Sequence, residues 1–113
     1  MAAKRPVVKI ARGSSDPGLE QYKSALERYL AEHPTAKESE LYRHGRYSVR
    51  VRVVDPEFEG MNKKDRQNRV WPYLVSLPEE TLSDLSFLVL VSPEEKSKQL
   101  SSIEFDDPIP ATL

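Results

Sequence analysis

The residues of this chain that could do chemistry are mainly cations, and they gather in its middle third. Residues 43–69 hold eight Lys and Arg against four Asp and Glu, whereas residues 70–113 hold two against eight. Such a stretch suits an acidic partner or an anion, and it equally suits pairing with the acidic end of the same chain. The candidate binding residues are Arg50, Arg52, Lys63, Lys64, Arg66, Arg69 and Trp71.

A catalytic or metal centre finds little support in the residue types. The chain has no cysteine, which excludes disulfides, thiolate metal sites and cysteine nucleophiles. Its two histidines, His33 and His44, are eleven positions apart, a spacing that does not place two ligands on one helical face. We therefore predict a protein that is not an enzyme and holds no cofactor or metal, with His44 as a weak candidate ligand only.

Length and overall charge limit the class of protein further. A chain of 113 residues makes one domain with a modest core. The net charge of −1 disfavours bulk binding of nucleic acid. No apolar run approaches the roughly 18 residues of a membrane span, so we expect no membrane partner. The absence of cysteine suits a reducing compartment, and we expect a cytoplasmic protein.

One strand and one helix must position the candidate residues. In the strand, Val49, Val51 and Val53 alternate with Arg50 and Arg52. This period of two is typical of a strand with one buried face. It predicts that the valines point inward beneath helices and that the two arginines lie on a face exposed to water.

The helix is predicted over residues 62–77, with Asn62 as its N-cap and lysines and arginines on its polar side. Pro72 lies inside this pattern. Because proline removes one hydrogen bond and clashes with the carbonyl four positions back, we expect a break or kink near Trp71.

The remaining elements complete a small α+β domain. We predict a helix over residues 19–33 that starts at Asp16-Pro17, a strand at 40–42 with a hairpin turn at His44-Gly45, a short helix from Pro78, a strand at 87–91 covered on both faces or central in the sheet, and a last helix over 93–101. The predicted order is α-β-β-α-α-β-α, a two-layer domain whose three-stranded mixed sheet is covered on one face by helices.

The domain is expected to span residues 18–103. Residues 1–17, rich in turn formers, are predicted to be a flexible arm, although Val7–Ile10 could add a short piece to a sheet edge. Residues 104–113 contain Asp-Asp-Pro-Ile-Pro, which cannot continue a helix, and are predicted to form a loose tail.

Residues spread over most of this domain follow the pattern of a known family. They are the valine-rich strand 49–53, Asp55, Phe58, Gly60, Arg66, Val70, Trp71, Leu74 and the strand and turn of residues 85–95. In this order and spacing they resemble the BolA family over roughly residues 19–100. The resemblance implies a class II KH-like fold and, as partner, a monothiol glutaredoxin with which an iron–sulfur cluster is shared.

The chain departs from that family at its histidines. The family's Arg-His-Arg reads Arg66-Gln67-Asn68, and Ser86 stands where the resemblance places a cluster-ligating histidine. His44 does fall in the hairpin loop where such proteins often carry a ligand. Because one imidazole without its partner is a poor iron–sulfur site, we expect no cluster ligation by this chain.

Two functions follow from these observations. The first is a BolA-like adaptor that binds a partner protein through its basic helix, with Trp71 either anchoring the interface or packed in the core. The second is a KH-like module that binds nucleic acid, with Tyr42 and Tyr47 stacking on bases. The cations assigned to this second surface are Arg50, Arg52, Lys63, Lys64 and Arg66.

Overall fold

The elements follow one another in the predicted order except for an added first strand, and the last helix lies at 100–106 and not at the predicted 93–101. The structure is a computed structural model that describes residues 7–110. In chain order its elements are β1 (Val7–Ile10), α1 (Pro17–Glu32), β2 (Glu38–Arg43), β3 (Val49–Val54), the 3-10 turn η1 (Pro56–Phe58), α2 (Lys63–Leu74), α3 (Glu79–Leu82), β4 (Leu85–Val91), the 3-10 turn η2 (Glu95–Ser97) and α4 (Leu100–Asp106). The α+β class is confirmed.

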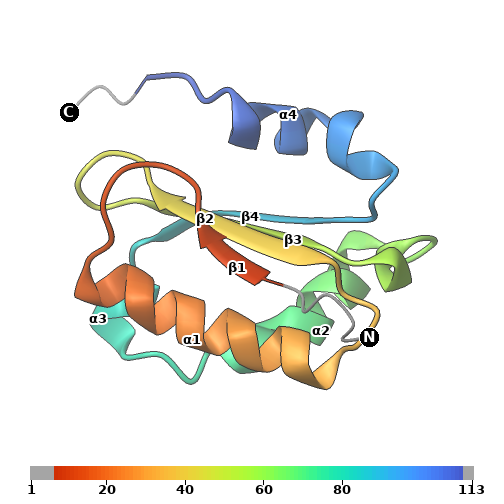
Figure 1. Ribbon diagram of the computed structural model, residues 1–113, viewed down its shortest axis with the longest axis horizontal. Coiled ribbons are helices and arrows are strands. Elements are labelled where there is room, and N and C mark those ends of the chain that lie inside the picture. Colours follow the sequence, from red (N-terminus) through yellow and green to blue (C-terminus); the bar gives the residue numbers. More distant parts are fainter. Residues whose placement is uncertain (1–6, 111–113) are drawn as a thin grey trace, which may run out of the picture.

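The sheet is mixed, as predicted, but it has four strands and not three (Figure 1). The strand order is β1-β2-β3-β4, with β1 parallel to β2, β2 antiparallel to β3, and β3 parallel to β4. The added strand is β1, whose residues we had assigned to the N-terminal arm and to a possible sheet edge. Its Val8 is buried and pairs with Ser39 of β2. Residues 1–6 of that arm lie outside the described residues.

One face of the sheet carries the main core, as the alternation predicts. Val49, Val51 and Val53 of β3 are fully buried, which confirms their inward orientation. They pack with residues of α1 and α2 in one hydrophobic cluster, and both helices lie on this face of the sheet (Figure 1). Strand β3 is therefore the centre around which the helices assemble.

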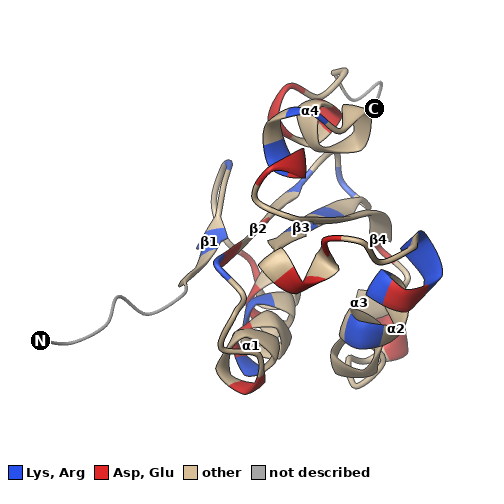
Figure 2. Cartoon of the chain, turned by 90° about the vertical axis from the view of Figure 1, so that its right-hand side faces the viewer, with Lys and Arg blue, Asp and Glu red and all other residues tan. Residues whose placement is uncertain are grey.

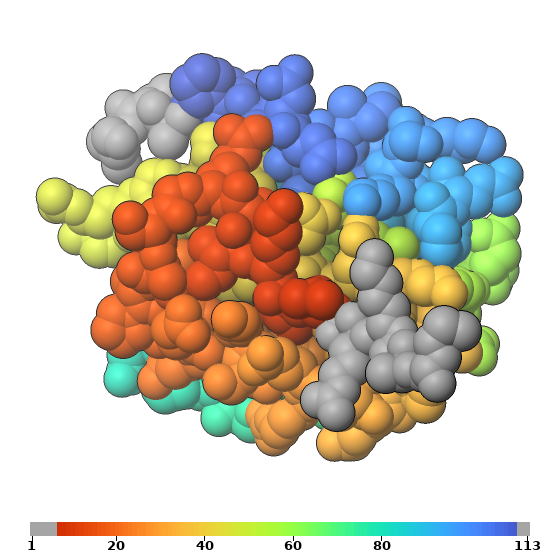
Figure 3. Space-filling view, viewed as in Figure 1, coloured from red at the N-terminus to blue at the C-terminus, as the bar shows by residue number. Residues whose placement is uncertain are grey.

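The other face is also covered, so the prediction of a sheet covered on one side only is wrong. Helix α4 lies across this face (Figure 1), and its Phe105 packs with Tyr42 of β2 and Val89 of β4. The helix runs to Asp106, into the segment we had expected to be a loose tail. In the space-filling view the C-terminal residues close the top of the molecule (Figure 3). The result is a three-layer arrangement.

The predicted caps and turns are present at α1 and at the hairpin. The Asp16 carboxylate accepts a hydrogen bond of 2.9 Å from the Leu19 N–H, and Pro17 opens the helix. Gly45 in the β2–β3 turn has φ of +81°, a conformation that glycine adopts without strain.

Helix α2 differs from its prediction at the proline. It runs without interruption through Pro72 and ends at Leu74, so there is no break near Trp71, which was one of the two outcomes expected there. Val70 and Leu74 are fully buried on either side of the proline. Their burial holds this last turn in helical geometry although Pro72 donates no hydrogen bond. None of the helices formed by residues 7–110 is long and apolar enough to cross a lipid bilayer.

Candidate functional site

The two arginines of β3 do not lie on an exposed face, which corrects the first part of the predicted surface. Arg52 is 1% exposed and donates to Glu40 at 2.5 Å, to Asp106 at 2.9 Å and to the Ser102 hydroxyl at 3.0 Å. Arg50 is partly buried, with its guanidinium 4.9 Å from the centre of the Phe87 ring. Both are covered because α4 packs on this face.

Arg69 also points inward, toward a buried carboxylate at the end of β3. Its Nε donates to the Tyr29 hydroxyl at 3.0 Å, and that hydroxyl donates to Oδ2 of Asp55 at 2.7 Å. Asp55 is fully buried and also accepts from the Thr35 hydroxyl at 2.9 Å and the Glu57 N–H at 3.0 Å. Burial, followed by the hydrogen bond to Asp55, raises the pKa of Tyr29 far above its ordinary value. These residues support the fold and leave Arg69 occupied.

Arg66 joins three elements at one end of a surface groove. From α2 it donates to the backbone carbonyls of Met61 and Leu90, each at 3.0 Å, and to the two carboxylate oxygens of Glu95 at 2.7 and 3.1 Å. The bidentate geometry is the strong form of an arginine–carboxylate pair. The Arg66 hydrogen bonds, against the opposing effect of burial and with help from the Ser92 N–H, lower the pKa of Glu95 to about 2.

Three of the seven candidate residues remain on the surface, all on α2. Lys63 and Lys64 are exposed, and neither forms a salt bridge with another residue of the described chain. Trp71 is 42% exposed, so it is not a core residue. Figure 2 shows basic and acidic segments interspersed on α2 and around α4, not one continuous basic face.

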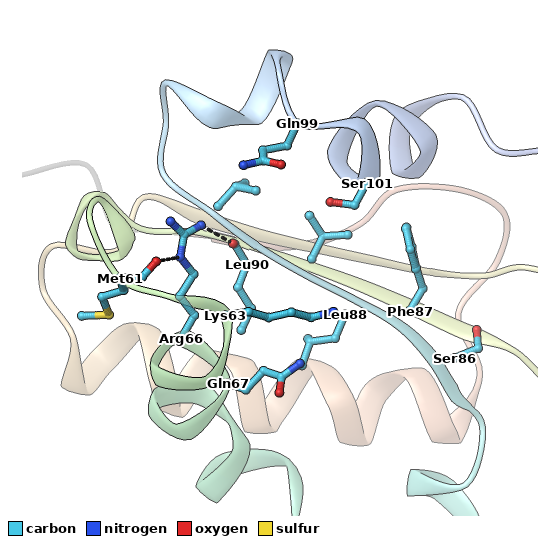
Figure 4. Close-up of a pocket in the computed structure, with 12 residues that line it drawn as sticks. Met61, Lys63, Arg66, Gln67, Ser86, Phe87, Leu88, Leu90, Gln99 and Ser101 are labelled. Atoms are coloured by element: carbon cyan, nitrogen blue, oxygen red, sulfur yellow. Dashed lines mark hydrogen bonds between the residues drawn. The ribbon is translucent and has the colours of Figure 1, made fainter.

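Two of these residues, Lys63 and Trp71, border a groove that follows the outer edge of β4. The groove has a volume of about 620 Å³, which is within the usual range of roughly 300–1,000 Å³ for ligand pockets. One wall is α2, with Lys63 and Gln67, and the other is the η2–α4 segment, with Gln99 and Ser101 (Figure 4). Leu88 and its neighbours in β4 form the floor.

A second, smaller hollow continues the groove toward the start of β4. It has a volume of about 420 Å³ and shares Gln67 and Leu88 with the first hollow. Trp71 lies on its α2 side. We call the two hollows together the β4 groove, which extends along the strand from Leu85 to Val91.

Ser86 and His44, the two positions compared with the ligand positions of the BolA family, do not lie in a common metal site. Ser86, where the BolA resemblance would place a histidine, hydrogen-bonds to Ser48 just before β3. The His44 ring packs edge-on against Tyr42, with ring centres 6.3 Å apart. Among residues 7–110 no group of three or more His, Asp or Glu side chains is placed to hold a metal ion.

The basic residues of α2, which form one wall of the groove, could be identified from the sequence. The floor formed by β4 and the second wall formed by the η2–α4 segment were not predicted. The signal for the floor was the apolar run 87–91, which we interpreted as a strand covered on both faces or central. It is covered on both faces, with Leu88 and Leu90 packed beside the main core and Val89 and Val91 beneath α4, but it is an edge strand.

A scan against protein-family models and searches of curated proteins and of solved structures found no match for this chain.

Proposed function

We propose that this protein is a non-enzymatic, BolA-like interaction module that docks a partner protein in the β4 groove, without ligating an iron–sulfur cluster itself. The observation that carries the proposal is the groove, in which an unpaired strand edge lies beside the exposed Trp71 and Lys63 of α2. Tryptophan is among the residues that contribute most to protein interfaces, and a concave apolar floor with a polar rim suits such an anchor.

The nucleic-acid alternative draws less support from the described residues. It relied on cations from β3 and α2 that converge on one surface. Arg50 and Arg52 lie beneath α4, and Arg66 is matched by Glu95. The two lysines that remain exposed on α2 supply too little positive charge for a phosphate-tracking surface by themselves.

Site-directed photo-crosslinking in cells that naturally make the protein tests the proposal. A benzophenone amino acid at Gln67 or at Trp71 should give a discrete protein adduct, because both positions face the groove. The same amino acid at Glu27, exposed on α1, is the matched control and should give none. Adducts that disappear on nuclease treatment would favour the nucleic-acid module, and equal adducts at Glu27 would contradict docking in the groove.

The absence of cluster ligation is tested separately, because the family resemblance names a monothiol glutaredoxin as a partner. After co-expression with such a glutaredoxin, the visible absorption of any complex should be the same for the native chain and for a His44→Ala variant. His44 is the only histidine near the family's ligand positions, and Ser86 offers a poor ligand. A visible band that depends on His44 would contradict this part of the proposal.

A further inference from the structure

The backbone along the outer edge of β4 has hydrogen-bonding groups without a partner. The Val91 carbonyl accepts from the Asp55 N–H at 3.0 Å, so the backbone groups of Val91 face β3. Because successive residues of a strand present their groups to opposite edges, those of Leu90 and Leu88 face outward. Arg66 donates to the Leu90 carbonyl from that side, as this alternation requires.

Leu88 lacks even such a side-chain partner. Among the hydrogen bonds of residues 7–110, none joins a side chain to its N–H or carbonyl, and β4 has a neighbouring strand only on the β3 side. Its outward groups lie at the floor of the groove, between α2 and the η2–α4 segment (Figure 4). An N–H and a carbonyl that lie without a partner on a strand edge can form hydrogen bonds with the carbonyl and N–H of an added strand.

The sequence of β4 contains neither lysine nor proline, although its pairing with β3 shifts register between Val49 and Arg50. Edge strands are commonly blunted by lysine, by proline or by a short length. The other edge strand, β1, is four residues long and presents Lys9. In contrast, β4 is seven residues long, with five consecutive apolar residues from Phe87 to Val91. Of the two edge strands, β4 is therefore the longer and the more apolar one, and it lacks the lysine that β1 presents.

The charge of the groove selects among the chains that could pair there. Its lining contains no Asp or Glu, and it includes Lys63, which forms no salt bridge within the described chain, and Arg66, whose charge is offset by Glu95. In Figure 4 the Lys63 side chain extends along the groove toward Leu88. A second copy of this chain, paired antiparallel through β4, would bring two α2 helices together on the same side of the sheet and set their lysines against each other. Like charges disfavour that arrangement, and an acidic segment is favoured.

We propose that the β4 groove binds an extended acidic segment of a partner protein, which adds to the sheet as a fifth strand. Side chains of the added strand alternate between the two walls. Asp or Glu residues face Lys63 on α2, and the apolar residues between them face Phe87 and the α4 side. This inference rests on the proposed function and specifies the chemistry and the binding mode of the partner.

The test uses the full chain and a short acetylated peptide that alternates valine and glutamate. Trp71 is the only tryptophan of the chain, and its place at the groove makes its fluorescence a reporter of binding. Two further peptides carry N-methyl groups on alternate residues, so that each blocks one edge of the extended peptide. Strand addition predicts that one methylation register lowers the affinity at least tenfold and that the other leaves it nearly unchanged. A peptide with lysine in place of glutamate should also bind at least tenfold more weakly.

Variants and amide exchange test the site on the protein. Leu88→Pro removes the outward N–H without removing a hydrogen bond to β3, whereas Leu88→Ala keeps the N–H and loses the same apolar contacts. With both variants shown to be folded by circular dichroism, the proline variant should bind the peptide at least tenfold more weakly than the alanine variant. Hydrogen exchange of the Leu88 amide in the native chain should slow when the peptide is bound.

Three outcomes would overturn the inference. They are no binding of the valine–glutamate peptide at millimolar concentration, equal binding of both methylated peptides, and a dimer of the free chain that Leu88→Pro dissociates. Each of these is compatible with photo-crosslinks at Gln67 and Trp71, which would then show a partner docked in the groove by side-chain contacts. Loss of those crosslinks would contradict the proposed function itself.

Discussion

Replacing Asp55 by alanine is expected to lower the free energy of unfolding by about 3–5 kcal/mol. The carboxylate is fully buried and accepts hydrogen bonds from Tyr29, Thr35 and the Glu57 N–H. It also faces Arg69, whose Nη2 lies 3.7 Å from Oδ2. Without the carboxylate, these donors lose their acceptor in a place that water does not reach, which makes the loss larger than for an exposed pair.

Chemical denaturation at neutral pH measures this loss, and thermal unfolding should show a fall in midpoint of roughly 10 °C or more. Asp55→Asn keeps one acceptor oxygen and the side-chain shape, so its expected loss is smaller, about 1–2 kcal/mol. Asp107→Ala, at an exposed aspartate, is the matched control and should change the stability by less than about 0.5 kcal/mol. A loss below about 1 kcal/mol for Asp55→Ala would show that the network is not structurally important.

The central strand could be predicted from the sequence because its two faces differ in chemistry along the chain. Val49, Val51 and Val53 alternate with arginines, and a period of two has one structural interpretation. The same alternation says only that Arg50 and Arg52 point to the opposite face. Whether that face meets water depends on another layer, and a strand pattern carries no information on a helix fifty residues away.

A signal for that layer was present in the last strand. Val89 and Val91 are apolar on the face opposite to Leu88 and Leu90, which requires cover on both sides of the sheet. Of the two interpretations of this strand, covered on both faces or central in the sheet, the first is inconsistent with a two-layer domain. The cover comes from α4, whose Phe105 lies in a segment that is expected to be a tail because Asp-Asp-Pro-Ile-Pro follows it directly.

The groove could not be predicted because it depends on strand order. Four strands give several possible orders, and only the position of β4 at an edge turns Leu88 into a residue with a free backbone. Strand β1 pairs with β2 at the opposite edge; the sequence indicates Val7–Ile10 as a possible edge strand, but a stretch of four residues does not show which edge it joins. Whether a strand lies at an edge or in the centre of a sheet is decided by the tertiary fold, whereas the basic residues of α2 can be identified in the sequence.

Acidification from about pH 5 to pH 2 is expected to weaken the fold through Glu95. Its folded-state pKa is about 2, below the ordinary value of 4.5, chiefly because Arg66 donates two hydrogen bonds to it. In the unfolded chain the carboxyl takes up a proton near its ordinary pKa, so between these values the unfolded state binds more protons. The stabilisation is therefore fully present above pH 5 and is lost as the pH falls toward 2.

The size of this contribution is roughly 2–3 kcal/mol, with allowance for the solvent that reaches Glu95. A Glu95→Gln variant should therefore be less stable than the native chain by about that amount at pH 7, and the difference should shrink as the pH is lowered. Urea denaturation at a series of pH values measures both chains. Glu94→Gln, which affects only an exposed pair with Lys98, is the matched control and should follow the native curve.

Arg66→Met removes the other partner and should give the same pH dependence as Glu95→Gln, because either change abolishes the pair. Glu95 also caps the segment by accepting a hydrogen bond from the Ser92 N–H, and Arg66→Met leaves this cap in place. The same pH dependence in both variants would therefore assign the effect to the Arg66–Glu95 pair and not to the cap. If Arg66→Met retained the native pH dependence, the cap and not the arginine would hold the pKa of Glu95 low. Because Arg66 also donates to the Leu90 carbonyl, its loss would leave one more acceptor without a partner at the edge of β4.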